Sequence, residues 1–229
     1  QPQELTPSPW NIRRRIHGYG GGAFTLDSAG DKLGLAWVDA SNDCLWFKEW
    51  SGLQNVCEEN PTLKELNNPL CLSKSNDLHL GDGLIDLGKM IWLGVMEKED
   101  RDYLVTFSLL DKLQEPKIIY RAADFIGYPK LSPNTRNLAW VEWKRPDMPW
   151  DKSSLMVGIL LDSERLDSVQ LLAGTYSESS KPISVFQPIW LKNDQLLISD
   201  DQNGWWNLKL LEIGIGEVFI SQFKNIFKI

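Results

Sequence analysis

The chain has 229 residues, of which 42% are hydrophobic and 24% are charged, as in an ordinary globular domain. Its formal net charge of −7 argues against a nucleic-acid-binding protein, and no apolar run approaches the ~20 residues of a membrane-spanning helix. The three cysteines lack C-x-x-C spacing, histidines number only two, and no signal-peptide pattern is evident. We therefore expect reduced thiols, no metal site, no cofactor and a cytoplasmic location.

The first feature along the chain is the stretch IHGYGGGAF (16–24), which holds four of the 17 glycines. A phosphate-binding loop would lead into a helix, whereas AFTLDSAGDK (23–32) is typical of a strand and a turn. An oxyanion hole would need a nucleophile, and none is evident. The glycines instead favour backbone with positive φ, or a close approach to another chain segment, at the start of a strand. His17 and Tyr19 remain candidates to face a substrate.

Four segments of the chain repeat one another. The runs LAWVD (35–39), MIWLG (90–94), LAWVE (138–142) and LLISD (196–200) align on Trp37, Trp92, Trp140 and Ile198, at separations of 55, 48 and 58 residues. Each run is bounded by turn residues, as expected for a buried strand. One further short run precedes each of these segments and two more follow it, which predicts four strands per copy.

Four-stranded antiparallel units at this spacing are typical of β-propeller blades. We therefore expect an all-β fold with one domain over residues 1–229 and four blades, at 18–73, 80–122, 123–175 and 184–224. Because a blade buries its faces against its neighbours, these blades are expected to be part of a larger ring. An open set would expose two apolar blade faces and favour self-association. The one helical pattern is NPTLKELNN (60–68), which suggests about two turns.

Two later segments carry candidate site residues on loops. SNDLHLGDG (75–83) brings His79 near two aspartates, but a metal ion needs a tighter ligand set, so a turn between blades is favoured. EWKRPDMPWD (142–151) is predicted to be a long loop, in which Glu142 or Arg145 is suited to hold a peptide terminus by an ion pair. Trp143 and Trp150 are suited to wall a subsite. The alternative is a loop held by its own aromatic packing.

The segment SDDQNGWWNL (199–208) is typical of a turn followed by a strand. Trp205 and Trp206 are expected to alternate, with one packed between blades and the other pointing outward. Trp205 is the candidate to contact a substrate. The adjacent Asp200 and Asp201 are not predicted to form a catalytic dyad, because neighbouring strand residues point to opposite faces.

Three stretches resemble the propeller domain of S9-family serine peptidases, of the dipeptidyl-aminopeptidase and acylaminoacyl-peptidase type within the prolyl oligopeptidase clan. They are RRRIHGYGGGAF (13–24), YPKLSPNTRNLAWVEWKRPDMPWD (128–151) and SVFQPIWLKNDQLLISDDQNGWWNL (184–208). The resemblance covers residues 10 to 213, approximately. The sequence departs from the pattern where SPNTRN and LKND replace the usual S-P-D-G turns, and where Gly18 stands in place of a common acidic residue.

The resemblance implies a ring of about seven blades joined to a C-terminal α/β-hydrolase domain with a Ser-Asp-His triad. This chain has no G-x-S-x-G motif and its last histidine is His79, so we expect no catalytic residues and no peptidase activity from it alone. In an intact enzyme the propeller would gate access and help position short peptides. The rival interpretation is a stand-alone propeller that serves as a protein-interaction scaffold.

Overall fold

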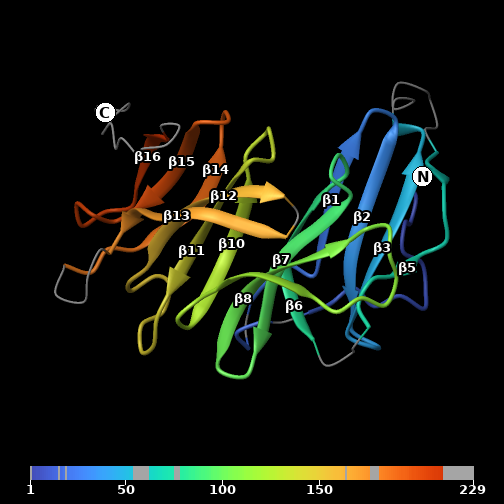
Figure 1. Cartoon of the computed structure of the whole chain (residues 1–229), viewed down its shortest axis with the longest axis horizontal. Helices are drawn as coiled ribbons and strands as arrows, with labels where there is room; N and C mark the ends of the chain where they lie inside the picture. Colours follow the sequence, from blue (N-terminus) through green and yellow to red (C-terminus); the bar gives the residue numbers. More distant parts are fainter. Residues whose placement is uncertain are drawn as a thin grey trace. The chain divides into compact units, whose positions relative to one another are not determined.

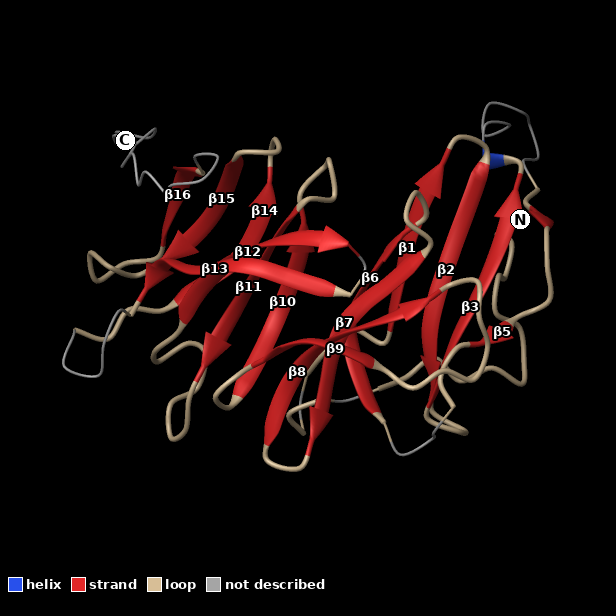
Figure 2. Ribbon diagram, in the orientation of Figure 1, coloured by secondary structure: helices blue, strands red, loops and turns tan. Residues whose placement is uncertain are grey.

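The computed structural model describes residues 2–14, 16–18, 20–53, 62–74, 78–162, 164–175 and 181–213. Strands account for nearly all the regular structure of these residues, and they form four antiparallel sheets (Figure 2). The prediction of an all-β fold with four blades is therefore confirmed. No helix in these ranges is long and apolar enough to cross a membrane. The chain divides into two compact units, residues 1–120 and 121–229.

The first unit contains two blades (Figure 1). Blade 1 comprises β1 (Phe24–Ala29), β2 (Lys32–Asp39), β3 (Cys44–Ser51), β4 (Lys64–Glu65) and β5 (Leu70–Cys71). Blade 2 comprises β6 (His79–Asp86), β7 (Ile91–Lys98), β8 (Arg101–Ser108) and β9 (Lys117–Arg121). The sheet orders are β1-β2-β3-β4, with β5 also paired to β3, and β6-β7-β8-β9. The first strands of the two blades, β1 and β6, lie side by side.

The second unit contains two further blades. Blade 3 comprises β10 (Phe125–Leu131), β11 (Asn137–Trp143), β12 (Ser154–Asp162) and β13 (Arg165–Gly174). Blade 4 comprises β14 (Val185–Trp190), β15 (Gln195–Asp200) and β16 (Asn207–Glu212). The strands follow one another in chain order within each sheet, and β10 lies beside β14. The predicted end of the fourth blade, residues 214–224, lies outside the described residues.

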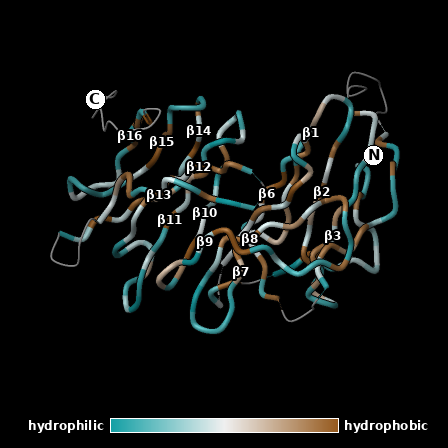
Figure 3. Tube along the Cα trace, viewed as in Figure 1, coloured by the Kyte–Doolittle hydropathy of each residue, from teal (hydrophilic) through white to brown (hydrophobic). Residues whose placement is uncertain are grey.

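The repeat explains which residues form the centre of each blade. Its four aligned positions, Trp37, Trp92, Trp140 and Ile198, all lie in the second strand of their sheets and are at most 2% exposed. A strand in second position has hydrogen-bonded neighbours on both sides, so its side chains are the easiest to bury on both faces. Apolar stretches accordingly follow the strand interiors, whereas most turns are hydrophilic (Figure 3).

Each unit has its core between its two sheets. In the first unit, Val38 and Phe47 of blade 1 pack against Trp92 and Phe107 of blade 2. The indole of Trp92 fits because two neighbouring positions are glycines: a Cβ on Gly83 would stand 2.3 Å from its Nε1. In the second unit, the corresponding cluster joins side chains of β11, β12, β14 and β15.

The outer face of blade 1 is covered by the segment that precedes it. Trp37 and Trp50 point away from blade 2, and Leu5, Trp10 and Ile12 pack against that side. The ring of Trp10 lies edge-on to Trp37, with centroids 5.1 Å apart. We call residues 2–12 the N-terminal strap. The expectation of two open apolar blade faces is thus wrong for blade 1, because the strap buries the tryptophans there.

The helix predicted for residues 60–68 is also wrong within its described part. Lys64–Glu65 is strand β4, which pairs with Trp50 and Ser51 of β3. Tertiary contacts decide the outcome: the side-chain amide of Gln3 in the strap donates to the carbonyl of Leu63 at 2.9 Å and accepts from its N–H at 2.8 Å. A two-turn helix has too little intrinsic stability to compete with such pairing.

Three of the four blades carry a bulge at the same place in their first strand. The register shifts between Gly81 and Leu84 in β6, between Gly127 and Lys130 in β10, and between Phe186 and Ile189 in β14. Each bulge contains one non-glycine residue with positive φ: Asp82 at 49°, Tyr128 at 57° and Gln187 at 53°. A bulge interrupts pairing and re-aims the side chain that it carries, so these positions are suited to display a residue.

Candidate functional site

The glycine-rich stretch forms a small closed loop before β1. Ile16 and Gly20 pair as an isolated antiparallel bridge, with hydrogen bonds of 2.8 and 3.0 Å between their backbones. His17 lies in the turn with φ of 56°, a conformation uncommon for a residue with a side chain. Tyr19, the other candidate in this loop, lies outside the described residues.

Blade 2 holds His17 by both its backbone and its ring. The N–H of His17 donates to Glu97 Oε2 at 2.8 Å, and its Nε2 lies 2.5 Å from Asp102 Oδ2. Both side chains of this contact are buried, with 5% exposure for His17 and 0% for Asp102. Glu97 and Asp102 are directly opposite one another on β7 and β8. The imidazole is therefore directed into the protein, which favours a positioning role over direct contact with a substrate.

The glycines let this loop approach blade 2 closely. The side chain of Ile16 is fully buried, and a Cβ on Gly21 would stand 2.4 Å from its Cγ1. Gly22 donates to Asp82 Oδ1 at 2.6 Å and accepts from the N–H of Asp82 at 3.0 Å, so the loop is also tied to the β6 bulge. The close approach that the sequence predicted is present, and it serves to fasten the loop to β6.

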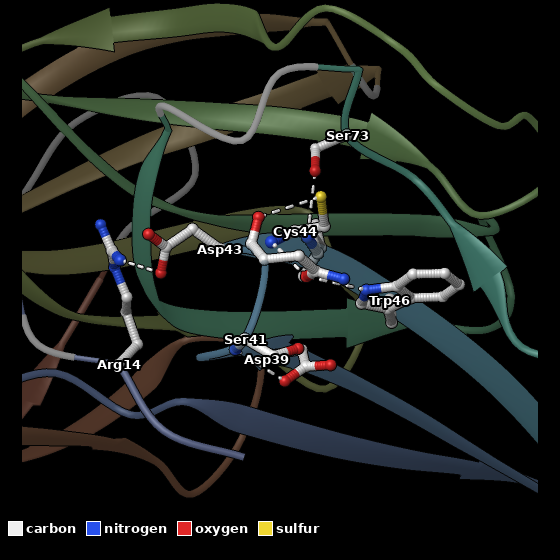
Figure 4. A network of polar contacts seen from close by, with 9 residues as sticks. Arg14, Asp39, Ser41, Asp43, Cys44, Trp46 and Ser73 are labelled. Atoms are coloured by element: carbon white, nitrogen blue, oxygen red, sulfur yellow. Dashed lines mark hydrogen bonds and ion pairs between the residues drawn. The ribbon is translucent and has the colours of Figure 1, made fainter. Parts of the chain in front are cut away.

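Arg14, just before this loop, is also engaged. The guanidinium of Arg14 forms an ion pair with Asp43 in the β2–β3 turn, and its side chain is only 11% exposed (Figure 4). In the same region, Ser73 Oγ accepts from the N–H of Leu45 at 3.0 Å. Cys44 and Cys71 are free thiols on β3 and β5. Burial, and secondarily the neighbouring Cys44, raise the pKa of Cys71 to about 11.

The loop predicted at 142–151 starts later than expected, because Glu142 and Trp143 are the last residues of β11, and aromatic and ionic contacts within blade 3 hold this segment. Trp143 stacks on Phe125 with ring centroids 5.6 Å apart, and the guanidinium of Arg145 lies 4.7 Å from the Phe125 ring. Arg145 Nη1 also lies 3.2 Å from Asp124 Oδ1, and the backbone N–H of Arg145 donates to Asp124 Oδ2. Arg145 is thus already engaged, so holding a peptide carboxylate would require it to exchange partners.

The other two candidates of this segment, Glu142 and Trp150, differ in environment. Glu142 Oε1 accepts from the indole N–H of the buried Trp140 at 2.7 Å, which fixes the carboxylate at the end of β11. Trp150 is exposed. Ser184 links this loop to the next candidate segment: its hydroxyl donates to the carbonyl of Pro149, and its N–H donates to Asp201 Oδ1 at 2.8 Å. The fold therefore brings the segments around Trp150 and Trp205 together through one serine.

The predicted alternation of Trp205 and Trp206 is wrong. Both precede β16 (Asn207–Glu212) and both are exposed, Trp205 at 79% and Trp206 at 50%. The turn through Gly204, with φ of 86°, brings both indoles out before the strand alternation begins. The two aspartates have separate partners: Asp200, the last residue of β15, is buried and paired with Lys209 at 2.7 Å, while Asp201 accepts from the N–H of Ser184.

Sequence reasoning missed a row of three rings in the second unit. Tyr128 contacts Phe186 at a centroid distance of 5.4 Å, and Phe186 contacts Trp206 at 5.6 Å. The available signal was the recurrence of proline in aligned strands, at Pro129 after Tyr128 and at Pro188 after Gln187. Proline within a strand pattern marks an edge strand or a bulge. We call Tyr128, Phe186 and Trp206 the aromatic row.

No cluster of three or more His, Cys, Asp or Glu side chains is arranged for a metal ion within the described ranges. His79 begins β6 opposite Glu97 and is exposed. The candidate side chains described above present aromatic rings, hydrogen-bonding groups and charges.

No family model and no curated protein sequence matches the chain. Among solved structures, it is similar to a puromycin-hydrolyzing peptidase of Mycobacterium tuberculosis, with a TM-score of 0.70 and 20% identity over 97% of this chain and 34% of that one. It is also similar to a puromycin hydrolase, with a TM-score of 0.69 and 19% identity over 94% of this chain and 33% of that one. The chain is also similar to prolyl oligopeptidase B from Galerina marginata, with a TM-score of 0.54 and 12% identity over 89% of this chain and 28% of that one.

These similarities confirm the expected resemblance at the level of the fold. The chain has the all-β fold of the portion of these peptidases that it covers, and it spans about a third of their length.

Proposed function

We propose that this chain is the non-catalytic propeller portion of an S9-type serine peptidase. The observation that carries the proposal is the TM-score of 0.70 over 97% of the chain with a peptidase of about three times its length. The three sequence stretches that resemble the propeller of this family support it independently. The proposal includes a larger ring of about seven blades, a C-terminal α/β-hydrolase domain, and a cytoplasmic location.

In this proposal, the propeller restricts access to the hydrolase and helps position short peptides, of the kind cleaved by dipeptidyl aminopeptidases or acylaminoacyl peptidases. The exposed Trp150 and Trp205 and the carboxylate of Glu142 are the side chains through which it would act on substrate. His17 would act indirectly, by holding the glycine-rich loop. None of these roles requires a nucleophile in this chain.

The test uses the chain and the complete transcript. The purified chain is incubated with a fluorophosphonate probe and with aminoacyl and acylaminoacyl chromogenic substrates, and the transcript is sequenced downstream of codon 229. We expect no labelling and no turnover from the chain, and a continuous frame that encodes G-x-S-x-G followed by Asp and His. Labelling of the chain itself, or a stop codon in place of that frame, would overturn the proposal.

The rival function, a protein-interaction scaffold, is favoured by one observation. Leu208 of β16 is exposed and pairs with Ser199 of β15, so it lies on the face of blade 4 opposite to the one on which Ile198 packs in the core. We propose that the isolated chain self-associates weakly through this face, because exposed apolar area favours association. Sedimentation of the parent chain and of Leu208→Ser tests this: concentration-dependent mass in the parent should diminish in the variant, and equal behaviour of the two excludes the face as the contact.

A further inference from the structure

The aromatic row is built at the place where two bulged strands lie side by side. Tyr128 stands at the bulge of β10, and Phe186 immediately precedes the bulge of β14. Trp206 completes the row from the turn before β16. The rings contact in T-shaped and tilted geometries, at 5.4 and 5.6 Å, which are favourable arrangements for aromatic pairs.

The first residue of the aromatic row, Tyr128, has an unfavourable backbone conformation. Tyr128 adopts a φ of 57°, in a region that bulky side chains rarely occupy. Tyr128 as a whole is 38% exposed, and Trp206 is 50% exposed. Asp82 and Gln187 share this positive φ at the equivalent bulges, so the conformation belongs to the bulge, and at Tyr128 the bulge carries a large side chain that is partly exposed.

The surroundings of the row limit what it can bind. Pro129 and Pro188 remove backbone donors at the bulges, so an added β-strand would find an interrupted edge there. Before the turn that carries Trp206, Asp200 is paired with Lys209 at 2.7 Å, and Asp201 accepts from the N–H of Ser184. The site therefore offers rings beside the carboxylate of Asp201, which disfavours an anionic guest next to Trp206.

We propose that Tyr128, Phe186 and Trp206 form a subsite for an uncharged aromatic side chain of a peptide. The inference rests on the proposed function and deepens it, since it specifies the class of peptide side chain that the propeller selects. A guest ring would extend the row by one more edge-to-face or offset contact. It would be held by side-chain contacts rather than by strand addition.

The experiment measures binding of blocked tripeptides to the purified chain by isothermal titration calorimetry and saturation-transfer NMR. The probes are acetyl-Ala-X-Ala-amide, in which X is Phe, Leu or Glu. We expect the Phe peptide to bind about 3- to 10-fold more tightly than the Leu peptide, and the Glu peptide to bind most weakly. Tyr128→Ala and Trp206→Ala should each weaken binding of the Phe peptide by a similar factor. Phe186→Leu, which keeps the apolar bulk, should weaken it less than either.

The matched control is Leu161→Ala, an exposed apolar residue of β12 that has no ring contact in the row. Thermal unfolding of every variant verifies that it is folded. Equal affinity for the Phe and Leu peptides, or unchanged affinity in the row variants, would overturn the subsite and leave the peptidase assignment intact. Failure of all three peptides to bind would overturn the subsite together with the positioning role, whereas the transcript and the serine probe test the peptidase assignment separately.

Discussion

The Nε2 of His17 lies 2.5 Å from Oδ2 of Asp102, and both side chains are buried. The two residues are separated by 85 positions in the sequence. Their contact therefore joins the loop that precedes blade 1 to strand β8 of blade 2. The backbone N–H of His17 is held in addition by Glu97. The glycine-rich loop is therefore a fastening between two blades as well as an approach to β1.

Replacing Asp102 by alanine should destabilise the first unit strongly. The imidazole of His17 would remain buried without its carboxylate partner, which costs about 2–4 kcal/mol in the free energy of unfolding. Asp102→Asn keeps an acceptor oxygen and should lose less. Urea unfolding followed by circular dichroism measures both variants. The exposed Lys98 at the end of β7 supplies the control Lys98→Ala, and equal midpoints for Asp102→Ala and this control would refute the fastening role.

Two adjacent glycines of the loop should respond differently to the same substitution. A Cβ on Gly21 would stand 2.4 Å from Ile16 Cγ1, and its φ is 90°, so Gly21→Ala should cost about 1–3 kcal/mol. A Cβ on Gly20 would meet no atom within 4 Å, so Gly20→Ala should change the free energy of unfolding by less than about 0.5 kcal/mol. Denaturant titration of the pair decides the matter. Similar losses at both positions would mean that the loop needs glycine for a reason other than packing on Ile16.

Removing the ring of Trp10 should uncover the outer face of blade 1. This ring packs edge-on against Trp37 and lies 4.9 Å from Trp46, so Trp10→Ala should lower the melting temperature and expose apolar surface. Increased binding of the dye ANS and a rise in sedimentation mass would report the exposure. Trp205→Ala removes the same ring from a position that is 79% exposed and should leave the melting temperature and dye binding nearly unchanged. A Trp10→Ala variant that behaves like Trp205→Ala would show that the strap does not cover the face in solution.

The thiol of Cys71 should react slowly at neutral pH. Its pKa is raised from 9.0 to about 11, first by burial and then by Cys44, so the thiolate at pH 8 should be about 100-fold scarcer than for an unperturbed thiol. Alkylation by iodoacetamide, followed by peptide mass spectrometry, should give a Cys71 rate that increases up to about pH 11. Because the folded pKa is the higher one, the contribution of this thiol to stability is present below pH 9.0 and is lost as the pH rises toward 11. A rate that levels off near pH 9 would contradict the assignment.

Much of the fold follows from local pattern. The aligned positions Trp37, Trp92, Trp140 and Ile198 recur with turn residues on either side, and a short apolar run between turns has few alternatives to a buried strand. Four such copies, each with three companion runs, leave blades as the consistent architecture. The prediction was wrong where contacts distant in the sequence decide the conformation, as at Lys64–Glu65, where pairing with β3 overrides a weak helical pattern.

The candidate site was accessible to sequence reasoning only in outline. His17, Arg145 and the tryptophans stood out by residue type. No local pattern could reveal that Asp102 would be the partner of His17, or Asp124 the partner of Arg145. The aromatic row joins residues about 60 and 20 positions apart, whose side chains meet because β10 lies beside β14 and the turn before β16 reaches Phe186. The sequence by itself determined the blades, because hydrophobic periodicity acts along the chain. Only the tertiary structure decided which side chains bind a partner within the protein and which are exposed to solvent, because partners and burial depend on how the blades pack.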